Sequence, residues 1–252
     1  MTQSLRPPVF FSDELRFGEG DISLSLEEYR QAVERKPQED DLAYAKRLAA
    51  VIAKGTAHIH WERYEPAKFN QLVPIWENWI LHVVGRFSGI PEFERYHFVT
   101  PEKSMERGIG ICGEVSMLMT TLLENNGIEA SMVTVPGHVL VTADFADKTY
   151  IFDPDFGVVL PYAAHELADN ADSASQLYVE AGYKDYDKAF FQRAFTQPFK
   201  LWRGPEHFIS NKYYFEKISY GLIWIVPIFL IIVALLIKPT RTKQRRDGAN
   251  GT

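Results

Sequence analysis

The feature that most constrains this chain is an apolar run near its C-terminus. Residues 218–237, ISYGLIWIVPIFLIIVALLI, form a stretch of twenty positions without a charged side chain. A helix of that length reaches about 30 Å, the thickness of the hydrocarbon core of a bilayer. Tyr220 and Trp224 lie near one end, where aromatic residues mark a membrane interface, and Pro227 is tolerated in a membrane helix. A buried core helix would be unusually long and featureless. We therefore predict a single transmembrane helix over residues 218–237, in contact with membrane lipid.

Charge is unevenly divided on the two sides of this run. The chain has a formal net charge of −6. Residues 238–252 are predicted to form a basic tail of net charge +4, which leaves −10 for the rest of the chain. An acidic body argues against a nucleic-acid partner. The tail's cations are Lys238, Arg241, Lys243, Arg245 and Arg246, set against Asp247.

The side of the membrane on which the body lies is weakly constrained. Four cations within about twenty residues precede the span and five follow it, so the positive-inside rule only slightly favours a cytoplasmic tail. Residues 1–20 lack the uninterrupted apolar segment of a signal peptide, which argues against export of the body. These two cues conflict, and we expect a single-pass membrane protein with a preference for a cytoplasmic body.

Local patterns predict an α+β body. Its composition, 46% hydrophobic and 24% charged, is typical of a packed globular domain. A capping box at Ser25 and Glu28 opens one helix, a second runs over residues 40–54, and a third over residues 67–87 is kinked at or begun at Pro74. Three β-like runs follow, at residues 128–135, 138–145 and 149–155, and short turns between them predict consecutive hairpins. The chain beyond Leu160 becomes helical again, up to the span.

The only cysteine, Cys112, opens a helical pattern. It lies among glycines in GIGICGEV, and a single cysteine excludes an intrachain disulfide. Asn126-Gly127 provides a stop signal for the helix. We therefore predict that Cys112 stands at the N-terminus of a helix of about a dozen residues with a buried apolar face. That face consists of Val115, Leu118, Met119, Leu122 and Leu123.

Cys112, His138 and Asp153 together indicate nucleophilic catalysis. The N-terminus of a helix stabilises a thiolate and offers N–H groups to an oxyanion. His138 begins a predicted strand and can take the proton of the thiol, and Asp153 ends the next strand and can orient the imidazole. Neighbouring antiparallel strands bring such ends together. We therefore predict these three as catalytic residues, with Cys112 as the nucleophile.

The segment GIGICGEVSMLMTTLLENNGIEASMVTVPGHVLV, followed by YIFDPDFG, resembles the transglutaminase-like superfamily of the papain-type fold. The resemblance covers residues 108–157: a glycine-flanked cysteine opens a helix, a Gly-His pair begins a strand, and Asp-Pro closes the next. Ile151-Phe152 stands where the family has a tryptophan. The resemblance implies Cys112 as nucleophile, His138 as base and Asp153 as its partner, in a family that includes acyltransferases, proteases, amidases and inactive members.

These observations predict a papain-like, transglutaminase-like domain over residues 21–210, in which N-terminal helices and a cysteine-bearing helix pack on an antiparallel sheet. Residues 1–20 are an N-terminal extension. The expected function is a membrane-anchored cysteine enzyme, a hydrolase or acyltransferase that acts on an amide or ester bond through a thioester. We expect no cofactor and no metal, and a peptide, a protein-like substrate or an envelope component as partner. The alternatives are a catalytically inactive membrane-tethered interaction module of the same fold, and a small redox or metal sensor.

Several other residues have weaker claims to a site. His58, His60 and Glu62 resemble a metal cluster, although such alternation is more typical of a solvated surface. Glu114 is expected to support the N-terminus of the cysteine helix. Asn78, Trp76 and Trp79 are candidates for a side-chain oxyanion donor, and these tryptophans together with Trp61 are otherwise expected in the core or packed beside the membrane.

Overall fold

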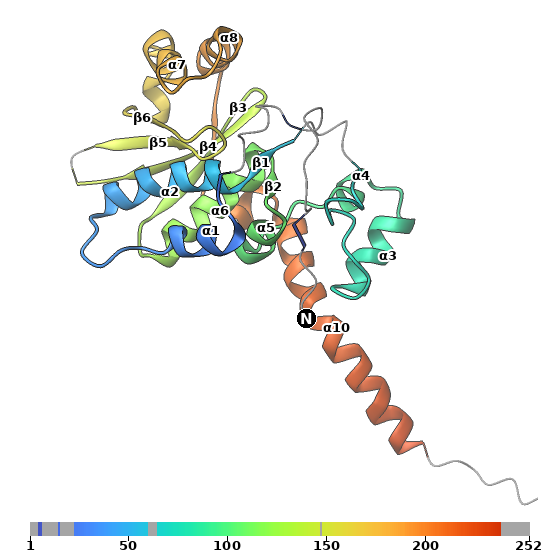
Figure 1. Cartoon of the computed structure of the whole chain (residues 1–252). Helices are drawn as coiled ribbons and strands as arrows, with labels where there is room; N and C mark the ends of the chain where they lie inside the picture. The colour runs from blue at the N-terminus through green and yellow to red at the C-terminus, as the bar shows by residue number, and fades with distance from the viewer. Residues whose placement is uncertain (1–4, 7–14, 16–22, 60–64, 147, 238–252) are drawn as a thin grey trace, which may run out of the picture.

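The computed structural model describes residues 5–6, 15, 23–59, 65–146 and 148–237. The body is an α+β domain with helices on both faces of a five-stranded antiparallel sheet, and one long helix leaves it at the C-terminus (Figure 1). The strands in this part of the chain are β1 (Ala57–His58), β2 (Ile109–Gly110), β3 (Ala130–Val135), β4 (His138–Asp144), β5 (Thr149–Asp153), β6 (Val158–Leu160) and β7 (Lys200–Trp202). The helices are α1 (Leu26–Val33), α2 (Asp41–Gly55), α3 (Trp79–Phe87), α4 (Pro91–Glu94), α5 (Pro101–Arg107), α6 (Cys112–Asn125), the 3-10 turn η1 (Ala164–Glu166), α7 (Ala171–Glu180), α8 (Asp185–Phe195), α9 (Pro205–Phe208) and α10 (Ser210–Leu236).

The sheet has the order β6-β5-β4-β3-β7, and every neighbouring pair is antiparallel. Val135 pairs with His138, so Pro136-Gly137 forms the two-residue turn that was predicted, with Gly137 at φ 81°. The hairpin of β4 and β5 is also confirmed. The two edge strands were not predicted, because three residues are too short for the alternating pattern of a strand to be recognised.

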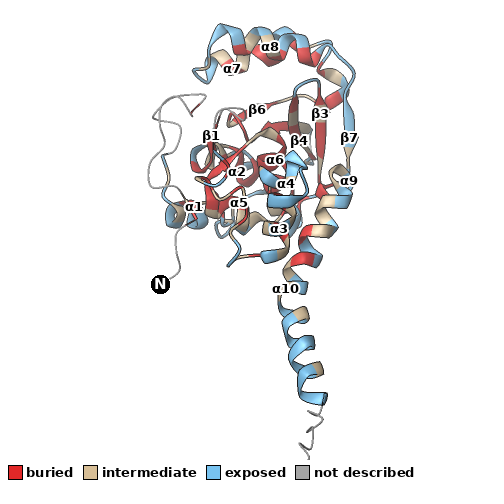
Figure 2. Ribbon diagram, turned by 90° about the vertical axis from the view of Figure 1, so that its right-hand side faces the viewer, coloured by how far each residue is buried: buried red, intermediate tan, exposed pale blue. Residues whose placement is uncertain are grey.

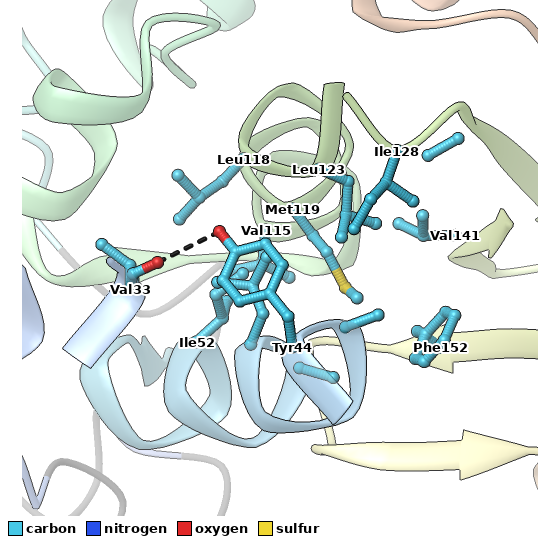
Figure 3. Packing of buried hydrophobic residues seen from close by; sticks show 14 of the residues in the cluster. Val33, Tyr44, Ile52, Val115, Leu118, Met119, Leu123, Ile128, Val141 and Phe152 are labelled. Carbon is cyan, nitrogen blue, oxygen red and sulfur yellow. Dashed lines mark hydrogen bonds between the residues drawn. The ribbon is translucent and has the colours of Figure 1, made fainter. Parts of the chain in front are cut away.

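The two faces of the sheet have separate cores. Val141 of β4 and Phe152 of β5 face α1, α2 and α6, and Figure 3 shows this core from close by. The hydroxyl of Tyr44, which is buried there, donates a hydrogen bond of 3.1 Å to the carbonyl oxygen of Val33. Leu140 and Ile151, one position away on the same strands, face α7 and α8 instead. This alternation holds the sheet between the two layers of helices.

Two of the three predicted N-terminal helices are confirmed. Ser25 and Glu28 form the capping box that opens α1. The third prediction is wrong in extent, because α3 begins only at Trp79. Asn78 caps it, with Oδ1 accepting from the backbone N–H groups of Ile80 and Leu81 at 3.1 Å each, and the preceding residues 67–78 form turns.

Helix α10 is long and apolar enough to cross a membrane, and among the described residues it is the one such helix. It begins at Ser210, before the predicted span, because its first turns belong to the body. The carboxylate of Glu216, which is buried, accepts hydrogen bonds of 3.0 Å from the backbone N–H groups of Val99 and Thr100. Burial then ends, and the second half of the helix is exposed along its length (Figure 2). The predicted basic tail, residues 238–252, and most of the N-terminal extension lie outside the described residues.

Candidate active site

Cys112 is the first residue of α6, as predicted. The preceding residue, Ile111, is extended and provides no side-chain cap. The first N–H groups of a helix have no partner within the helix. The thiol, which is partly exposed, therefore stands beside the positive end of the helix dipole.

The glycines before Cys112 have a structural role. Gly108 adopts the left-handed conformation, with φ 63°, that ends α5. A Cβ atom at Gly108 would lie 2.7 Å from the guanidinium group of Arg6, and one at Gly110 would lie 3.1 Å from the methyl group of Thr56. The absence of a side chain at Gly108 and Gly110 therefore lets the backbone before α6 pack closely against Arg6 and Thr56.

His138 begins β4, immediately after the Pro136-Gly137 turn. A hydrogen bond joins this strand to the cysteine helix: the hydroxyl of Ser116, which is buried, donates to the carbonyl oxygen of Val139 at 3.0 Å. Ser116 lies one turn after Cys112, and Val139 is the residue after His138. This bond therefore sets the thiol and the imidazole relative to each other.

Asp153 ends β5, is fully buried, and uses both oxygens of its carboxylate. Oδ2 contacts Nε2 of His138 at 2.8 Å and accepts a hydrogen bond from the hydroxyl of Tyr178 at 2.8 Å. Oδ1 accepts from the backbone N–H groups of Asp155 and Phe156 at 3.0 and 3.2 Å. One oxygen thus holds the turn after β5, and the other orients the imidazole.

The thiol of Cys112 interacts with the imidazole of His138. Burial lowers the pKa of His138, but Asp153 and Cys112, through their charges and their hydrogen bonds, outweigh burial and raise this pKa well above its ordinary value of 6.5. Because Nε2 is bonded to Asp153, Nδ1 is the nitrogen left to exchange a proton with the thiol. The structure therefore brings the three predicted residues together.

Aromatic side chains enclose His138. Its ring makes edge contacts with Phe156 and Phe191, at centroid distances of 5.7 and 5.1 Å, and it is only 5% exposed. Tyr178 stacks on Phe191 at 3.7 Å, which places its hydroxyl at Asp153. Tyr178 was not predicted, because it lies on α7, beyond the recognised motif, and no local pattern marks it.

His58 and Asp155 form a second histidine–aspartate pair. Nε2 of His58 is 3.1 Å from Oδ1 of Asp155, and both side chains are buried. His58 pairs with Gly110 in the parallel ladder of β1 and β2, two residues before Cys112. This pair therefore links the segment that leads into the cysteine to the turn that carries Asp153. The one sequence signal for this pair was Asp155, the second aspartate of the sequence Asp153-Pro154-Asp155.

His58 is buried, so it does not lie on the solvated surface that its alternation with His60 and Glu62 favoured. His60 and Glu62 lie outside the described residues, and among the residues that are described no group of three ligating side chains could hold a metal ion. The partner of His58 is instead the carboxylate of Asp155.

Glu114 has a more specific role than the predicted electrostatic support of α6. Its side chain is buried; Oε2 contacts Nδ1 of His97 at 2.6 Å, and Oε1 accepts from the backbone N–H of Phe98 at 3.1 Å. It therefore ties the chain at residues 97–98 to the first turn of α6.

The side-chain amide of Asn78 is already bonded to other partners, so it is not available as an oxyanion donor. The amide oxygen of Asn78 caps α3, and its nitrogen donates to the hydroxyl of Ser219 at 3.0 Å. Trp76 and Trp79 are exposed, so a core position is excluded for them, and Trp61 lies outside the described residues. The backbone N–H groups at the start of α6 are therefore the candidate oxyanion donors in the part of the chain that the structure describes.

Comparison of the chain with models of protein families, with curated proteins and with solved structures found no significant match.

Proposed function

We propose that this protein is a membrane-anchored cysteine enzyme of the transglutaminase-like, papain-type class that cleaves or transfers an acyl group. The observation that carries the proposal is a thiol at the N-terminus of a helix that raises the pKa of an imidazole, which a buried carboxylate holds in place. Nucleophilic acyl transfer needs a nucleophile, a base and a group that orients the base, in this order.

The reaction has two stages. The thiolate of Cys112 attacks the carbonyl carbon of an amide or ester, a C–S bond forms, and the carbonyl oxygen takes the negative charge toward the N–H groups at the start of α6. The C–N or C–O bond then breaks, and the leaving group takes a proton from the imidazolium of His138. Water or an amine next attacks the thioester, gives its proton to His138, and releases the acyl product and the thiolate of Cys112.

Helix α10 supports the membrane part of the proposal. Its length and apolar composition are those of a transmembrane anchor. Its first turns are part of the body: the backbone N–H of Val99, just before α5, donates a hydrogen bond to the carboxylate of Glu216 on α10. The substrate is therefore expected to be a peptide or envelope component at the membrane surface.

Alkylation of the single cysteine tests the chemistry. We expect iodoacetamide to label the wild-type chain at Cys112 faster than an unperturbed thiol at neutral pH, because the helix dipole and an imidazolium favour the thiolate. Replacing Cys112→Ala should abolish labelling and any hydrolysis of amide or ester substrates. The matched variant His138→Gln keeps the thiol, and we expect its turnover to fall by roughly 10²-fold or more.

A second candidate is a non-catalytic, membrane-tethered interaction module of the same fold. It is favoured by the enclosure of His138 beneath Phe190 and Phe191 of α8, which limits access to the imidazole. Labelling of Cys112 at the rate of an ordinary thiol, with a biological role that survives Cys112→Ala, would support this candidate and contradict the enzyme.

A further inference from the structure

Helix α3 presents large apolar side chains to the outside of the body. Trp79, Val83 and Phe87 recur at intervals of four residues and share one side of the helix, and Phe87 is 77% exposed. Leu81 and Gly85, on the opposite side, are buried. Ile75 and Trp76 before the helix and Ile90 after it extend the exposed set. The α3 apolar face is defined as Ile75, Trp76, Trp79, Val83, Phe87 and Ile90.

The start of α3 is attached to α10 near the point where α10 leaves the body (Figure 1). The side-chain amide of Asn78, the cap of α3, donates to the hydroxyl of Ser219 at 3.0 Å. The hydroxyl of Tyr220 donates to Oε1 of the adjacent Glu77 at 2.9 Å. Two hydrogen bonds therefore hold the start of α3 at the level of residues 219–220.

The length of a membrane span places that level at the bilayer surface. About twenty helical residues are needed to cross a hydrocarbon core of about 30 Å. Counted back from Ile237, the last residue of the predicted span, these residues reach Ile218. Ser219 and Tyr220 therefore lie at the edge of the hydrocarbon, and α3, bonded to them, lies among the lipid headgroups.

We propose that the α3 apolar face is a second membrane contact, which inserts into the interface of the same bilayer that α10 crosses. The proposal rests on the anchor in the proposed function and not on the chemistry of Cys112. Lipid is the occupant because α3 packs against α10, whose exposed apolar part begins beside it, and because the face includes two tryptophans, which favour the interface. Between Trp79 and Phe87 the one charged residue is Arg86, so little charge must be removed from water when this side of the helix contacts lipid.

A second contact has a consequence for the body. A single spanning helix allows the domain to rotate and tilt, whereas a contact beside it fixes the orientation of the domain. The α3 apolar face would therefore hold the cysteine helix at a constant height and angle above the lipid.

A fluorescent label on α3 tests this contact in the full chain. In a Cys112→Ala background, Val83→Cys and Phe87→Cys each carry an environment-sensitive fluorophore, and Glu180→Cys, exposed on α7, is the matched control. The chains are reconstituted in phosphatidylcholine vesicles. We expect doxyl-labelled lipid to quench the α3 labels and aqueous iodide to leave them bright, with the opposite result for the control.

Each other outcome overturns the contact. Quenching of the α3 labels by iodide means that the face is open to water. Protection from both quenchers means that protein covers it, such as a second copy of the chain. A label at Leu230→Cys on α10 reports the anchor separately: if doxyl lipid quenches it but not the α3 labels, the second contact fails while the anchor stands. Alkylation of Cys112 in the wild-type chain tests the chemistry independently of both.

Discussion

Asp153 shows how one buried carboxylate combines a structural and a chemical role. An aspartate before a proline is a common turn residue, and Oδ1 does hold the turn through two backbone N–H groups. Oδ2 is left to contact His138 and Tyr178. Burial and the charge of Asp153 raise the pKa of Tyr178 well above its ordinary value of 10.0. The hydroxyl of Tyr178 therefore stays protonated and donates a hydrogen bond to the carboxylate.

The raised pKa of His138 predicts a pH profile. The imidazolium protonates the leaving group, so we expect kcat/KM to fall as pH rises through the pKa of His138, well above 6.5. Alkylation of Cys112 needs no proton donor and should not fall over this range. Asp153→Asn removes the charge but keeps the shape, and should move the fall in kcat/KM to lower pH. A fall at the same pH in both proteins would contradict the assignment.

At the scale of elements, a buried ion pair joins α5 to the turn before α3. The guanidinium of Arg107, which is fully buried, contacts Oε2 of Glu77 at 2.6 Å and lies 3.8 Å from the ring centroid of Phe98. Glu77 also accepts the hydrogen bond from Tyr220 of α10. This carboxylate therefore connects α5, the segment before α3 and α10.

Removal of Glu77 should destabilise the body strongly. Glu77→Ala leaves the charge of Arg107 buried without its carboxylate partner, and we expect a loss of about 3–5 kcal/mol in the free energy of unfolding. Tyr220→Phe removes only a hydrogen bond to the same carboxylate, which costs about 1–3 kcal/mol. Urea unfolding of the detergent-solubilised chain, followed by near-ultraviolet circular dichroism, measures both. Equal losses in the two variants would show that the ion pair is not the main link.

The ion pair of Arg107 and Glu77 makes the stability of the body depend on pH. Burial raises the pKa of Glu77, but the charge and hydrogen bond of Arg107, the charge of Lys103 and the hydrogen bond from Tyr220 together outweigh burial, and the pKa is lowered below its ordinary value of 4.5. The contribution of Glu77 to stability is therefore complete above pH 4.5 and is lost as pH falls through the lowered pKa. Glu77→Ala removes this dependence.

At the scale of the whole molecule, α10 belongs to two environments. Its first turns complete the body through Glu216 and Ser219, and its exposed remainder has the composition of a membrane span. The boundary between body and anchor therefore falls within one continuous helix, near Tyr220.

Two truncations should separate these parts. A chain that ends after Tyr220 loses the predicted span but keeps the contacts of Glu216 and Ser219. We expect it to behave no longer as an integral membrane protein, with the α3 apolar face as its remaining lipid contact, and to retain its fold and its rate of Cys112 alkylation. A chain that ends after Ile209 leaves Val99 and Thr100 without the carboxylate of Glu216, and we expect it to unfold at lower urea concentration or to aggregate. Equal stability of the two truncated chains would show that the first turns of α10 are not part of the body.

The local elements of this protein follow from sequence patterns, because caps, turns and periodicity depend on neighbouring residues. These patterns predicted α1 with its capping box, α6 beginning at Cys112, and the hairpins of β3, β4 and β5. They also predicted the three residues that the fold brings together at the candidate site. The order Cys112, His138, Asp153 was visible because all three lie within one continuous segment of motif.

Contacts between distant segments could not be predicted in this way. Tyr178 reaches Asp153 from a helix 25 residues away, His58 meets Asp155 across the molecule, and Asn78 bonds Ser219 over 141 residues. No local pattern contains such pairs, since they form only when separate cores pack against the same sheet. The exposure of Trp76 and Trp79 was likewise hidden, because a tryptophan has the same hydrophobicity in a core as at a membrane surface, and burial is a property of the packed chain.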